Sequence, residues 1–93
     1  MSRRKYLTVV VQNNETLQWE VMVEDIRLQL TREQDILDRM GIWTAKREAV
    51  YPKEHWRAWT QLTDIPGQWR TAFAAQNGVE PPPSTVRPRH QLR

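Results

Sequence analysis

The chain has 93 residues, with five tryptophans, no cysteine and a formal net charge of +3. This length allows one small domain that buries about 60–65% of the surface of its unfolded chain. The lack of cysteine excludes disulfides, cysteine nucleophiles and thiolate metal sites. No stretch approaches the roughly 20 apolar residues of a membrane span, so we expect a soluble, intracellular protein with no membrane contact.

The charge is unevenly distributed. Residues 1–80 contain equal numbers of basic and acidic side chains, so the positive excess comes from Arg87, Arg89 and Arg93. Phosphate contacts dominate the affinity of proteins for nucleic acid, and a neutral body argues against such binding. A basic-tailed, nucleic-acid-associated accessory protein is kept as an alternative.

The N-terminal quarter has the pattern of two strands. Residues 6–11 are β-branched and aromatic, which is typical of a strand. Residues 17–24 alternate, and one face of the expected strand carries Leu17, Trp19, Val21 and Val23. The pattern predicts a β-hairpin over 6–24, whose apolar face must rest on other elements because two strands alone are marginally stable.

The middle of the chain predicts short helices. Residues 25–30 are compatible with a continued strand or with the start of a helix. Thr31 and Gln34 have the spacing of a capping box, and Gly41 is a natural end for the helix that would follow. A second helical segment is expected to begin near Thr44.

A third helix is expected over 53–62. Trp56, Trp59 and Leu62 recur there at three-residue spacing, which would place them in one apolar stripe on a helix. Because one small core has little room for five indoles, we expect part of this stripe to face a partner.

These patterns together predict an α+β fold. An N-terminal two-stranded antiparallel β-hairpin, 6–24, would be followed by three or four short helices within 26–78, the last of them ending at Gly78. Residues 1–80 would form a single small domain, and 81–93 an extended Pro- and Arg-rich C-terminal arm.

Catalytic chemistry finds little support in the sequence. The only serines are Ser2 and Ser84, in segments without a regular pattern, and neither His55 nor His90 has a second ligand one helical turn away. We therefore expect no enzyme, no cofactor and no bound metal.

The residues that we expect to bind a partner are aromatic and basic. Core packing is the alternative for every tryptophan, and homo-oligomerisation is a further option for the chain. The predicted partner-binding residues are Trp43, Trp56, Trp59 and Arg57 in the body, and Arg87 and Arg89 in the arm.

Three segments resemble the small tail assembly chaperones of tailed bacteriophages. They are Arg-Glu-Gln-Asp-Ile-Leu at 32–37, Gly-Ile-Trp at 41–43, and Leu-Thr-Asp-Ile-Pro-Gly-Gln at 62–68, with Trp56 upstream of the last. The chain departs from that pattern at Thr63, where the family has arginine.

The resemblance implies a non-catalytic protein acting in assembly or structure of a phage tail or virion. Its partner would be a tail, fibre or baseplate subunit, contacted through a Trp-rich helical face and the C-terminal arm, in the host cytoplasm or the virion. A small phage-encoded inhibitor of a host protein is the other alternative.

Overall fold

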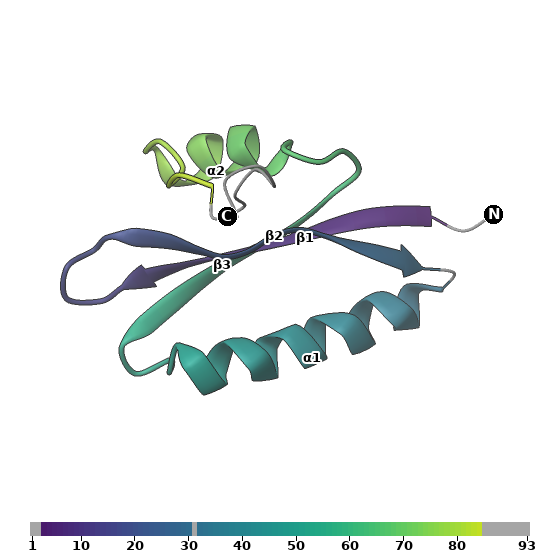
Figure 1. The fold of residues 1–93 in the computed structure, drawn as a ribbon, viewed down its shortest axis with the longest axis horizontal. Helices are drawn as coiled ribbons and strands as arrows, with labels where there is room; N and C mark the ends of the chain where they lie inside the picture. The colour runs from purple at the N-terminus through teal and green to yellow at the C-terminus, as the bar shows by residue number, and fades with distance from the viewer. Residues whose placement is uncertain (1–2, 31, 85–93) are drawn as a thin grey trace, which may run out of the picture.

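The computed structural model describes residues 3–30 and 32–84. Five elements follow one another in the chain: β1 (Arg3–Asn13), β2 (Trp19–Leu30), α1 (Glu33–Val50), β3 (Trp56–Thr63) and α2 (Trp69–Asn77). The strands form one antiparallel sheet in the order β2-β1-β3. α1 lies against one face of this sheet and α2 against the other (Figure 1).

The central strand β1 supplies the core of both layers. Leu7, Val9 and Val11 are buried on the face toward α1, and Val10 is buried on the face toward α2. A strand covered on both faces must be apolar on both, which explains its unbroken run of apolar and β-branched residues.

β2 does not keep the predicted alternation, because its register with β1 shifts twice. Val9 pairs with Val23, whereas Val10 pairs with Val21, so Met22 is an extra residue on β2. Val21 therefore packs on the α2 side and Val23 on the α1 side.

The second irregularity is centred on Asp25. This residue has a φ of 51°, and its backbone N–H donates to Thr8 Oγ1 at 3.1 Å. The predicted common face for all four apolar residues of 17–24 is therefore wrong. Leu17 also lies before the strand and is 63% exposed.

α1 is a single helix that runs through Gly41, so the predicted break there is wrong. A glycine in an exposed helix costs about 1 kcal/mol relative to alanine, which an 18-residue helix tolerates. The helix begins after Arg32, whose backbone N–H donates to Asp35 Oδ2 at 3.1 Å. The predicted cap at Thr31 lies outside the described residues.

The predicted helix over 53–62 is also wrong, since 56–63 form β3. Trp56 and Leu62 pack on the α1 side of the sheet, and Trp59 packs on the α2 side. The three-residue spacing thus arises from apolar side chains on two covered faces, and it imitates the stripe of a helix.

α2 follows the sequence prediction more closely. Trp69 and Phe73 are fully buried, and Gly78 ends the helix with a φ of 69°. The class α+β is correct, but the predicted order of a hairpin and three or four helices is wrong. Among the described residues, neither helix combines the length and the hydropathy of a membrane span.

Residues 79–84 fold back over the sheet after α2. Pro82 is buried, and its carbonyl accepts a hydrogen bond from Arg70 Nη1 at 3.0 Å. The Ser84 hydroxyl donates to Glu24 on β2. The described start of the predicted arm therefore lies against the α2 side of β2.

Candidate interaction surface

The structure does not bring the predicted partner-binding residues together. Trp43 lies on α1, whereas Trp56, Arg57 and Trp59 lie on β3. Because side chains alternate along a strand, Arg57 and Trp59 share the α2 face and Trp56 has the α1 face. Arg87 and Arg89 lie outside the described residues.

Trp59 is partly buried in the layer between the sheet and α2. Its ring lies 6.2 Å from the ring of Trp69, and its Nε1–H donates to Gln76 Oε1 at 2.9 Å. It lies opposite Val10 of β1. Both ends of this indole therefore have contacts within the chain.

Trp56 and Trp43 are partly buried on the other face of the sheet. The Trp56 ring meets Tyr51 edge-on, with centroids 4.8 Å apart. The Lys46 ammonium lies 4.5 Å from the centroid of the Trp43 ring, which is within cation–π range. Each ring thus packs on its own chain and keeps part of its surface in solvent.

α1 makes only a thin contact with the sheet. It contains 18 residues, and none of them is buried. Its contact stripe consists of Ile36, Met40 and Trp43, which are partly buried against the sheet. Leu37 and Ile42 lie on opposite flanks of this stripe, and Val50 is the last residue of the helix; the three residues are 60%, 46% and 65% exposed. Within residues 3–30 and 32–84, no other element buries these separate apolar side chains of the helix.

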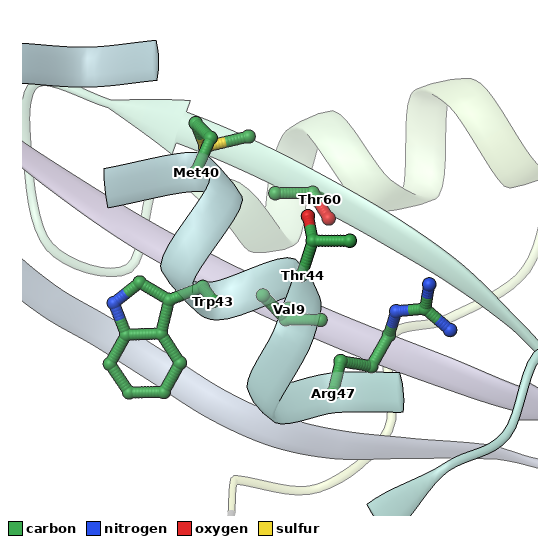
Figure 2. Close-up of a pocket in the computed structure, with 6 residues that line it drawn as sticks. All are labelled: Val9, Met40, Trp43, Thr44, Arg47 and Thr60. Carbon is green, nitrogen blue, oxygen red and sulfur yellow. The ribbon is translucent and has the colours of Figure 1, made fainter. Parts of the chain in front are cut away.

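A small pocket separates one flank of α1 from β3. Figure 2 shows Thr44 of α1 near Thr60 of β3, while the ring of Trp43 extends away from Thr60. The residues that line the pocket are Val9, Met40, Trp43, Thr44, Arg47 and Thr60. Leu37 is three residues from Met40 and seven from Thr44, so it lies on the same flank of the helix.

β3 also presents an open backbone edge. Among the strands of residues 3–30 and 32–84, it pairs with β1 alone. The Asn14 N–H donates to the His55 carbonyl at 2.9 Å. In an antiparallel pair, every second residue directs its backbone groups toward the partner strand, so this bond shows which residues of β3 face β1. The odd-numbered residues of β3 therefore direct their backbone groups toward β1, and Trp56, Ala58, Thr60 and Leu62 direct theirs outward.

Partial burial raises the pKa of the Tyr51 phenol above its ordinary value, and the negative charge of Glu20 raises it further. No group of three or more His, Asp or Glu side chains within 3–30 and 32–84 is arranged to hold a metal ion.

Sequence reasoning missed the apolar flanks of α1 and the edge of β3. Reading one helix over 33–50 would have placed Leu37 and Ile42 outside the stripe of Ile36, Met40 and Trp43. The edge position of β3 has no local signal, because strand order depends on long-range pairing. Comparison with protein-family models, curated protein sequences and solved structures finds no match to the chain.

Proposed function

We propose that this protein is a non-catalytic protein–protein interaction protein that acts in the assembly or structure of a larger complex. The observation that carries the proposal is α1, an 18-residue helix without a buried side chain. Most of the stability of a helix in a protein comes from packing of its apolar face. A helix this long and this poorly covered is suited to pack against a partner subunit.

The apolar side chains of α1 provide the energy for such a contact. Leu37, Ile42 and Val50 are each about half exposed or more. Full burial of a leucine, isoleucine or valine side chain is worth about 1.5–3 kcal/mol. Ile42 at the centre of an interface would therefore contribute a large part of its affinity.

The proposed partner is a tail, fibre or baseplate subunit of a bacteriophage. This choice rests on the sequence resemblance at 32–37 and 41–43, which both belong to α1 or its N-terminal cap. The resemblance gains nothing from 56–63, where a helix was implied and a strand is found. The proposed contact surface is therefore on α1, because Trp56 and Trp59 lie on a strand and not on a helix.

Photo-crosslinking of the full chain tests the proposal. A photoreactive amino acid at position 42, in cells that assemble the particle, should crosslink to one subunit of it. The same amino acid at position 18, in the exposed β1–β2 turn, should not.

Binding to that purified subunit then measures the contribution of the helix. Ile42→Lys should weaken binding at least tenfold, equivalent to about 1.4 kcal/mol. Gln18→Lys adds the same charge in the turn and should leave the affinity unchanged. Equal affinity of both variants, or the same crosslinks from both positions, would remove α1 from the interface.

A further inference from the structure

We propose that the protein forms a symmetric dimer through β3, whose open edge pairs antiparallel with the same edge of a second copy. The two sheets would become one continuous sheet. This inference adds a self-association site to the proposed function, which concerns α1, and does not depend on it.

The first support is the direction of the backbone groups along the open edge of β3. Trp56, Ala58, Thr60 and Leu62 direct their backbone groups away from β1, as the bond from Asn14 to His55 requires. The Trp56 N–H is used in the turn before β3, where it donates to the Pro52 carbonyl at 2.9 Å. The other outward groups are on the side of β3 that no strand of the described chain covers.

The second support is self-complementarity. The four outward-facing residues are centred on Trp59, so a two-fold axis at Trp59 places each of them opposite another of the set. Ala58 then exchanges hydrogen bonds with Thr60 of the second copy, and the Leu62 N–H donates to the Trp56 carbonyl of the second copy. The two-fold axis generates the same hydrogen bonds on both sides of Trp59. None of these bonds uses the Trp56 N–H.

The third support is the set of side-chain pairs in this register. On the α1 face, Trp56 lies opposite Leu62 of the second copy. On the α2 face, Arg57 lies opposite Gln61 of the second copy, and Trp59 lies beside its own symmetry mate. Aromatic and apolar cross-strand pairs of this kind stabilise a ladder, and no like charges within β3 oppose one another.

The two outer strands differ in how well they could accept another strand. β2 has two register shifts, carries Glu20, Glu24 and Arg27, and is contacted by Ser84 from the segment after α2. Bulges and charges of this kind protect edges from pairing. β3 keeps one continuous register with β1, and Arg57 is its only charged residue. Its edge is therefore the suitable one.

The helices leave this edge accessible. α1 contacts β2, and Ala58 and Thr60 are exposed on the α1 side of β3. α2 packs on Val10 of the central strand through Trp69 and Phe73, and it meets β3 through the Trp59 side chain on the face of the sheet. A two-fold axis perpendicular to the sheet would place both copies of α1 on the same face, where their outer surfaces remain free for a partner.

Sedimentation equilibrium of the purified full chain tests the dimer. Thr60→Pro removes an outward N–H without removing a bond to β1, as prolines at sheet edges do. Thr60→Val keeps both the N–H and the β-branched shape. The wild type and Thr60→Val should sediment as dimers at about 100 µM, and Thr60→Pro should require at least a hundredfold higher concentration to associate. A monomeric wild type, or a Thr60→Pro variant that still associates normally, would overturn the proposal.

A cysteine experiment tests the register and does not depend on the folding of the proline variant. The chain has no cysteine, so single-cysteine variants report only the designed contact. In the proposed register, position 58 lies about 5.5 Å from position 60 of the second copy, within the range for a disulfide. Oxidation of mixed Ala58→Cys and Thr60→Cys proteins should give mostly the mixed dimer. Random pairing, or no crosslink, would overturn the β3 register.

The two proposals fail separately. Thr60→Pro should abolish self-association and keep the crosslinks from position 42, whereas Ile42→Lys should weaken the partner and keep the dimer. Loss of both properties in the folded Thr60→Pro variant would show that the partner, and not a second copy, occupies the β3 edge, and would overturn the dimer.

Discussion

The ring of Trp59 on β3 meets the ring of Phe73 on α2 edge-on, with centroids 5.1 Å apart and planes inclined at 84°. Trp19 makes a similar contact with Phe73 from β2, at 4.9 Å. Edge-to-face pairs are a favoured arrangement of aromatic rings and add to the energy of burial. Phe73 thus joins both outer strands to α2, and Trp59 is a structural part of this layer.

The first prediction concerns the stability of Trp59→Ala. The contacts of Trp59 with Phe73, Trp69 and Gln76 predict a loss of about 2 kcal/mol or more in the free energy of unfolding. Urea denaturation followed by circular dichroism measures it. Because a dimer would add to the apparent stability, the comparison is made in the Thr60→Pro background, and an unchanged midpoint there would contradict the prediction.

The second prediction concerns Asp25, which connects the irregular part of β2 to the turn before α2. Its Oδ2 accepts the Gly67 N–H at 2.8 Å, and its φ of 51° is strained for most side chains. Asp25→Ala should cost about 2 kcal/mol, since it loses the acceptor and keeps the strain. Asp25→Asn keeps an acceptor and tolerates the backbone, so it should cost about 1 kcal/mol or less. Thermal unfolding distinguishes them, and equal losses would show that the Gly67 bond contributes nothing.

The third prediction concerns Glu24, which connects three parts of the α2 layer. Its carboxylate accepts from Trp69 Nε1 at 3.2 Å and from the Ser84 hydroxyl, and lies 3.7 Å from Arg70 Nη2. The side chain is only 10% exposed. Glu24→Ala should cost about 2–3 kcal/mol, because the N–H of the buried Trp69 ring loses its acceptor and Arg70 loses its counter-charge.

Glu24→Gln is the matched control for that loss. It keeps an acceptor oxygen and removes the charge, so it should cost about 1 kcal/mol in urea denaturation. A glutamine variant as unstable as the alanine variant would mean that the charge beside Arg70, and not the hydrogen bonds, provides the stability.

The fourth prediction concerns alkaline pH. Burial and then the charge of Glu20 raise the pKa of Tyr51 in the folded protein above its ordinary value near 10. Between these two pKa values the folded state binds the phenolic proton more tightly than the unfolded state does. The stability from this group is therefore complete below about pH 10 and is lost as the pH rises through the folded pKa.

Tyr51→Phe isolates this effect, because it keeps the edge-on ring beside Trp56 and removes the titrating hydroxyl. The difference in unfolding free energy between the wild type and this variant should be constant below about pH 10 and change above it, with the wild type losing more stability. Parallel pH profiles of the two proteins would contradict the raised pKa.

The sequence by itself determined the strand character of β1, the class α+β, and the last helix with its end at Gly78. These features follow from local composition, periodicity and glycine chemistry, which act within a few residues. Tertiary structure decided that 56–63 form a strand and which side chains of β2 lie on each face of the sheet. Both faces of the sheet are covered, which removes the period of two, and the register shifts at Met22 and Asp25 depend on pairing with β1.

The candidate surfaces were likewise decided by tertiary structure. That α1 buries no side chain, and that β3 is an edge strand, depend on which segments pack or pair across the fold. The sequence showed that five indoles were present, but only the arrangement of two helices on opposite faces of one sheet assigned them to separate layers. The sequence predicted an uncovered surface at the tryptophans, whereas the structure has it on α1 and at the edge of β3. Contacts between distant segments have no local sequence pattern, so the sequence could not show this difference.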